Sequence, residues 1–148
     1  MNTALQVELS DTLSAVIGDM RVAVGQLSEA LAAERNALSQ ADAEALDRAG
    51  EAKQALMRRL EQLDAERVQL TQNLAAPSTE QQAAWADVLK ALAACQHANQ
   101  RNGSIVGQQL SQIRHALSVL TGGKDETNLY GPAGILSSGY RSLPLAEA

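Results

Sequence analysis

Residues 46–74 read LDRAGEAKQALMRRLEQLDAERVQLTQNL, a run with an unbroken helical repeat. Its seam positions alternate in steps of three and four, the heptad pattern of a helix that packs along another helix. The seam consists of Leu46, Ala49, Lys53, Leu56, Leu60, Leu63, Arg67, Leu70 and Leu74. Lys53 and Arg67 interrupt it, and we expect their aliphatic stems to lie along the partner while their charges stay in water. The pattern predicts a helix over residues 42–75.

A second apolar stripe precedes this run, between Leu5 and Leu38. Its steps are also threes and fours, apart from one missed turn near Glu34, and they predict a helix over residues 4–38. Between the two stripes, Ser39 or Asp42 can cap the following helix. A tight helical hairpin is the natural interpretation, and one bent continuous helix is the alternative.

A third stripe follows a break at Pro77. Proline disfavours the helical conformation of the residue before it, and Ser78 with Gln81 has the spacing of a capping box. The stripe then runs through Trp85, Val88, Leu92, Cys95, Asn99, Asn102, Val106, Ile113, Leu117 and Leu120 to a glycine stop. It predicts a helix over residues 79–120. We therefore expect an all-α fold, an antiparallel bundle of three long helices within a domain of residues 1–121.

Composition supports helices and excludes several classes of protein. The 148 residues include 27 Ala and 21 Leu, both strong helix formers, against only three aromatic residues. A net charge of −5 argues against a nucleic-acid-binding protein, which needs a clustered basic face. No apolar run approaches the roughly 18 residues of a membrane span, and the N-terminus lacks the features of a signal peptide. With a single cysteine, these observations predict a cytoplasmic protein without membrane insertion.

Residues 122–148 have a different composition, with five of the ten glycines and two of the three prolines. They lack a sustained period, and we expect a flexible C-terminal arm. The arm also contains Leu129, Tyr130, Ile135, Leu136, Tyr140, Leu143 and Leu145. A tail that only solvates a protein is more polar than this. The arm is therefore expected to contact another surface.

No group of residues suggests catalysis or metal binding. His97 and His115 lack an acidic or histidine companion at helical spacing. Cys95 falls on the apolar stripe and is expected to be a small core residue. We therefore predict neither an enzyme nor a bound metal or cofactor.

The third predicted helix carries the most unusual residues. Residues 76–121 hold only two acids and three bases, and Asn99 and Asn102 occupy seam positions where leucine is expected. Polar seam residues can set the register of a bundle, but Gly103 and Gly107 also remove side chains from this helix, and we favour a functional reason. More apolar residues lie here than one seam requires. The predicted binding surface consists of Asn99, Asn102, Gly103, Ile105, Val106, Leu110, Ile113, Leu117 and Leu120.

At these residues the sequence resembles the FlgN family of flagellar type III export chaperones. The likeness rests first on Glu34-Arg35-x-Ala-Leu38, Asp42 and Lys53 with its following leucines. It continues with Trp85, with Asn99-x-x-Asn102-Gly103-x-Ile-Val106, and with Leu129-Tyr130-Gly131-Pro132-x-Gly134 in the arm. The matching residues span nearly the whole chain in the order of the family.

The resemblance implies a cytoplasmic helical chaperone that binds the hook–filament junction proteins FlgK and FlgL before their export. The client site is expected on the third helix from its own residues, and the resemblance implies a contact of Tyr130, with Pro132, to the export gate protein FlhA. A structural coiled-coil adaptor that scaffolds another complex is the first alternative. An enzyme or metal-binding bundle is the second, and it lacks the necessary pairing of histidines and carboxylates.

Overall fold

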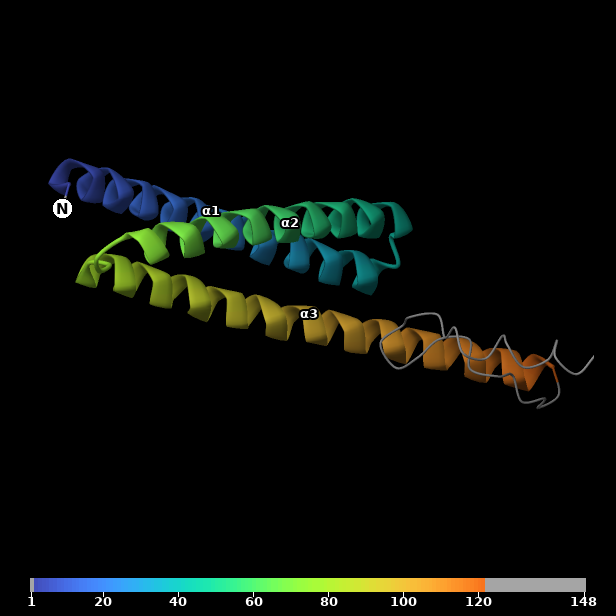
Figure 1. The fold of residues 1–148 in the computed structure, drawn as a ribbon. Helices are drawn as coiled ribbons and strands as arrows, with labels where there is room; N and C mark the ends of the chain where they lie inside the picture. Colours follow the sequence, from blue (N-terminus) through green and yellow to red (C-terminus); the bar gives the residue numbers. More distant parts are fainter. Residues whose placement is uncertain (1, 122–148) are drawn as a thin grey trace, which may run out of the picture. The chain divides into compact units, whose positions relative to one another are not determined.

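The computed structural model describes residues 2–121, and three long helices make up most of them (Figure 1). They are α1 (Thr3–Gln40), α2 (Ala43–Asn73) and α3 (Thr79–Leu120). The predicted all-α architecture of three long helices is confirmed, and each predicted end lies within two residues of the observed one. The arm predicted at 122–148 lies outside the described residues. The chain divides into two compact units, Met1–Asn99 and a second that begins at Gln100, so α3 contributes to both.

The connection between α1 and α2 is a tight reversal. Ala41 takes a left-handed conformation with φ 54°, and its N–H donates to the carbonyl oxygen of Leu38. Asp42 then caps α2, since its Oδ1 accepts from the backbone N–H of Ala45 over 3.0 Å. The hairpin interpretation is therefore correct, and the bent continuous helix is wrong. Of the two possible caps, Asp42 is the one used, while Ser39 donates to the carbonyl of Asn36.

The start of α3 is fixed by the predicted capping box. The N–H of Gln81 donates to Oγ of Ser78 over 3.1 Å, and the N–H of Ser78 donates to Oε1 of Gln81 over 2.8 Å. The Nε2 group of Gln81 also reaches α1, where it donates to the carbonyl oxygen of Ser10 at 2.9 Å. One side chain thus caps α3 and joins it to the beginning of α1.

Within the first unit, α3 runs parallel to α1 and antiparallel to α2. Gln81 contacts Ser10, and Cys95 contacts Val24, so the residue numbers of α1 and α3 rise together. The residue numbers of α2 fall as those of α3 rise, because Arg67 lies against Trp85 and Lys53 donates to Asn99. The first unit is therefore an up–down–up arrangement.

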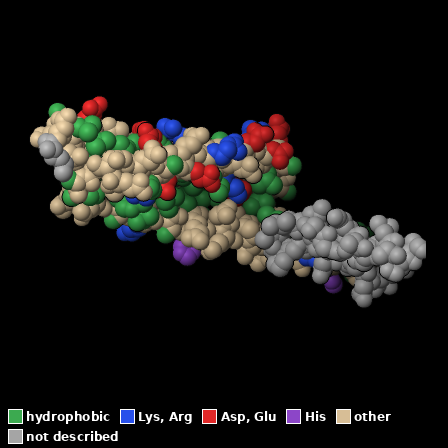
Figure 2. Space-filling view, viewed as in Figure 1, with side chains coloured by type: hydrophobic (Ala, Val, Ile, Leu, Met, Phe, Trp, Pro, Cys, Tyr) green, Lys and Arg blue, Asp and Glu red, His purple; other side chains and the backbone are tan. Residues whose placement is uncertain are grey.

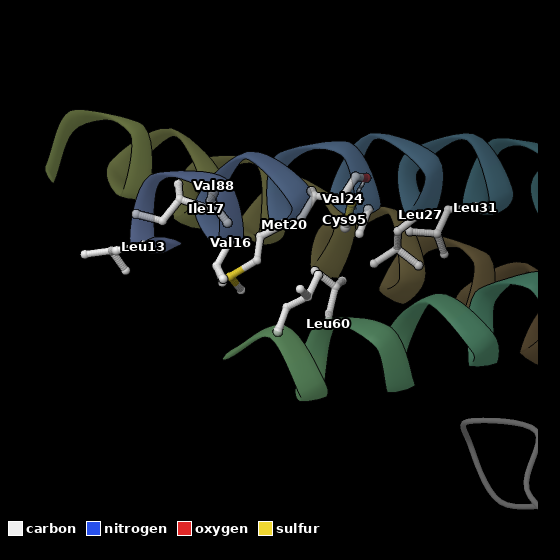
Figure 3. Close-up of a cluster of buried hydrophobic side chains, with 12 residues drawn as sticks. Leu13, Val16, Ile17, Met20, Val24, Leu27, Leu31, Leu60, Val88 and Cys95 are labelled. Atoms are coloured by element: carbon white, nitrogen blue, oxygen red, sulfur yellow. Dashed lines mark hydrogen bonds between the residues drawn. The ribbon is translucent and has the colours of Figure 1, made fainter. Parts of the chain in front are cut away.

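The core of this unit is an aliphatic cluster in which α1 supplies most of the side chains (Figure 3). Its members from α1 are Leu13, Val16, Ile17, Met20, Ala23, Val24, Leu27 and Leu31, and the other helices add Leu60, Leu63, Val88 and Cys95. Each fully buried large side chain contributes about 1.5–3 kcal/mol by leaving water. The packing of α1 against both other helices thus holds the unit together.

Candidate binding surfaces

A polar cluster joins one residue from each helix of the first unit. The ammonium Nζ of Lys53 lies 2.8 Å from Oε2 of Glu34 and 3.1 Å from Oδ1 of Asn99. Glu34 is buried, with 8% of its surface exposed. The prediction that the charge of Lys53 stays in water is wrong. The ammonium of Lys53 pairs with Glu34, which lies where the apolar stripe of α1 misses a turn. The same prediction is wrong for Arg67, whose guanidinium stacks on Trp85 and pairs with Asp64 over 2.9 Å.

The contact to Lys53 gives the seam position of Asn99 a structural role. A leucine there would leave the ammonium with one acceptor fewer, and a shifted register would separate all three groups. This observation supports the register-setting interpretation for Asn99. Its side chain remains exposed enough to reach a further partner.

Beside this cluster the three helices enclose an apolar groove of about 300 Å³. Leu27 and Leu31 of α1 are buried at its floor. The remaining lining comes from Lys53, Met57, Leu60 and Glu61 of α2 and from Leu92, Cys95, Gln96 and Asn99 of α3. In Figure 2 hydrophobic side chains gather along the middle of the first unit. Met57 is half exposed, so the groove is open to solvent.

In the second unit, α3 presents exposed apolar side chains in its last three turns. Ile113, Leu117 and Leu120 are 55%, 46% and 81% exposed. The other predicted residues of this unit are more enclosed: Asn102 is buried, while Gly103, Ile105, Val106 and Leu110 are partly buried. A Cβ atom added at Gly103 would meet nothing within 4 Å. Gly103 is therefore not required for a close approach between helices.

Helical geometry places most of the predicted surface on one face of α3. Steps of three and four residues join Asn99, Asn102, Val106, Leu110, Ile113, Leu117 and Leu120. Ile105 lies about 100° from Val106 around the helix axis and so stands beside this stripe. The sequence from Asn99 to Leu120 contains no Asp or Glu and two arginines, Arg101 and Arg114. The stripe is thus an apolar face on a helix with a positive charge.

Cys95 is a core residue, as its sequence position predicted. It is 5% exposed, and its Sγ donates to the carbonyl oxygen of Val24 at 3.8 Å. Burial raises the pKa of the thiol, which keeps it protonated and poorly nucleophilic near neutral pH. Among residues 2–121, no three His, Cys, Asp or Glu side chains lie together as metal ligands would.

Tyr130 and Pro132, the predicted contacts to an export gate, lie outside the described residues.

Within the described part of the chain, none of the helices has the length and apolar character needed to cross a membrane.

The groove in the first unit was missed by sequence reasoning. Its exposed wall is Met57, which is not a seam residue of its helix, and helical periodicity alone does not show that two neighbouring helices leave a space. A signal for the polar cluster did exist. Glu34 and Lys53 have opposite charges and lie six and ten positions from the helix ends that a short hairpin joins, so their long side chains can meet across it.

No curated protein and no solved structure matches the chain. The sequence model of one protein family, described as FlgN protein, matches residues 1–138.

Proposed function

Since the chain belongs to the FlgN family, the flagellar export chaperones for the hook-associated proteins FlgK and FlgL, we propose that it captures these clients on the apolar face of α3. Members of this family are not enzymes. The mechanism requires binding, shielding and release, and no chemical turnover. We place the site on the stripe from Asn99 to Leu120, with Gly103 and Ile105 at its side and without Asn102, which is only 3% exposed.

The observation that carries this proposal is the exposure of Ile113, Leu117 and Leu120. These three side chains recur at steps of four and three residues and so project from one face of the helix. Contiguous apolar surface of this kind on a folded chain usually marks a binding site. Covering these side chains with a client contributes about 25 cal/mol of binding free energy for every Å² of apolar surface removed from water.

The charge of α3 indicates the kind of client segment that fits. An amphipathic helix with anchors at matching steps can pack on the stripe, and acidic residues beside its anchors can face Arg101 and Arg114. If that segment is disordered when free, its ordering on binding costs part of the interaction energy. The affinity then stays moderate, which permits release at the export gate.

The test is isothermal titration of purified FlgK and FlgL into Ile113→Asp and Leu117→Asp. We expect each variant to bind at least tenfold more weakly, while circular dichroism shows unchanged helix content. Val22→Asp is the matched control, since Val22 is 61% exposed and belongs to α1 rather than to the α3 stripe. Unaltered binding by both α3 variants overturns the proposed site. Ile105 and Leu110 are less suitable because they are partly buried.

The second half of the proposal concerns delivery. We propose that the chaperone acts in the cytoplasm and that Tyr130 and Pro132 of the arm dock onto the export gate protein FlhA. A tyrosine suits such a contact, because it offers a large apolar face and a hydroxyl with little side-chain entropy to lose. A structural adaptor bundle is the competing function. Gel filtration separates the two, because a chaperone is stable alone and binds its client reversibly.

A further inference from the structure

The groove beside the polar cluster has different electrostatic character at its two ends. At one end Lys53 uses two of its three N–H donors on Glu34 and Asn99. The third donor and the Nδ2 group of Asn99 have no partner among the described residues. At the other end stands the exposed carboxylate of Glu61, about 12 Å further along α2. Between them the lining is mainly apolar.

This charge distribution is complementary to an α-helix. The last carbonyl groups of a helix lack internal partners and carry a partial negative charge, which favours nearby cations and N–H donors. The first turn carries unpaired N–H groups and a partial positive charge, which favours a carboxylate. A helix lying in the groove therefore meets Glu61 at its N-terminal end and Lys53 with Asn99 at its C-terminal end.

We propose that this groove binds an amphipathic helix of a client, oriented antiparallel to α2. The proposal rests on the function proposed above but assigns a second site, in the first unit, whose lining shares Asn99 with the α3 stripe. The span from Glu61 to Lys53 corresponds to about two helical turns, so two or three apolar side chains at steps of three and four enter the groove. Met57 forms the exposed wall, and its flexible thioether can adapt to anchors of different shape.

The first test places a charge on the exposed wall. Met57→Glu is expected to weaken the binding of full-length FlgK or FlgL at least tenfold in a calorimetric titration. The fold should tolerate this change, because Met57 is 50% exposed. Val22→Glu adds the same charge at an exposed position that does not line the groove, and it should bind like the unsubstituted chain. If Met57→Glu also binds normally, the groove is not a client site.

The second test reads the direction of the bound helix. Glu61→Lys replaces the carboxylate at the N-terminal end of the bound helix by a cation, and we expect client binding to weaken at least threefold. Glu66→Lys is the control for net charge, since Glu66 is exposed on α2 and does not line the groove. Tighter binding by Glu61→Lys would show the opposite direction, and binding equal to the control would remove the electrostatic argument. Either result overturns the proposal.

Two further outcomes separate this inference from the proposed function. If the unsubstituted chain binds neither FlgK nor FlgL, the proposed function itself fails. If the α3 variants lose the client while Met57→Glu does not, only the groove proposal fails. The remaining alternative is that a second copy of the chain occupies the groove, and analytical ultracentrifugation tests it. If the chain is a dimer that Met57→Glu converts to a monomer while client affinity is unchanged, the groove binds a second copy and the client assignment is overturned.

Discussion

Lys53 of α2 donates from Nζ to Oε2 of Glu34 on α1 over 2.8 Å, and the two side chains are only 22% and 11% exposed. Most other ion pairs of the described residues lie in water, such as Arg48 with Glu44 at 65% and 87% exposure. Surface pairs contribute little to stability, whereas a shielded charge that loses its partner is costly. We therefore expect the Glu34–Lys53 pair to favour the observed register of the hairpin.

Replacing one member of this pair is expected to destabilise the fold. Lys53→Met retains the aliphatic stem but leaves the carboxylate of Glu34 without its ammonium partner. We expect the free energy of unfolding to fall by about 2 kcal/mol, a value that allows for the remaining solvent access. Urea denaturation followed by circular dichroism measures the change. Arg48→Met, the surface control, should change it by less than about 0.5 kcal/mol.

The double variant Glu34→Leu with Lys53→Met completes the cycle. Because neither charge is then stranded, its loss should be smaller than the sum of the two single losses. Strict additivity of the two substitutions would show that the pair does not interact energetically.

These residues also show what the sequence could and could not predict. The helix bounds were predicted closely because capping depends on residues close in sequence, here Asp42, Ser78 and Gln81. The pairing of Lys53 depends on which residue of another helix lies opposite, and one helix's periodicity does not contain that information. The exposure of Ile113 beside the partial burial of Val106 is likewise decided by tertiary packing, although both lie on one stripe.

Gly103→Ala tests whether that glycine serves stability or binding. An added Cβ meets nothing within 4 Å, so the change should remove only the conformational cost of glycine in a helix. We expect the free energy of unfolding to rise by about 0.5–1 kcal/mol in urea titrations. Gly25→Ala, with equally open space, is the matched control.

If Gly103 opens the stripe to a client, Gly103→Ala should also bind FlgK or FlgL several-fold more weakly, whereas Gly25→Ala should not. Equal client affinity for the two variants would remove Gly103 from the proposed site.

The buried thiol of Cys95 is expected to make the free energy of unfolding depend on pH above neutrality. Burial raises the pKa of its thiol in the folded state, so the folded chain holds this proton more tightly than the unfolded chain. The resulting stabilisation is complete below the unfolded pKa of about 8.5 and is lost as the pH rises through the folded pKa. The urea midpoint should therefore fall more between pH 7 and pH 9.5 in the unsubstituted chain than in Cys95→Ala. Parallel decreases in the two proteins would contradict this assignment.

Tyr130→Ala separates delivery from capture. We expect binding to FlhA to weaken by about 1–2 kcal/mol, the range of a modest interface anchor, while the affinity for FlgK stays unchanged. Titration of each partner into the variant measures both quantities. Tyr140→Ala changes the other tyrosine of the arm and serves as the control. An equal loss for both partners would show that Tyr130 is not a dedicated gate contact.

The stacking of Arg67 on Trp85 has a practical consequence for spectroscopy. Trp85 is the only tryptophan of the chain, and its ring lies against a side chain of α2 while its backbone belongs to α3. The tryptophan fluorescence of the protein, excited selectively over its two tyrosines, is thus a single-site signal for the separation of these two helices. Comparing that signal with far-ultraviolet dichroism distinguishes loss of packing from loss of helix, with no label introduced.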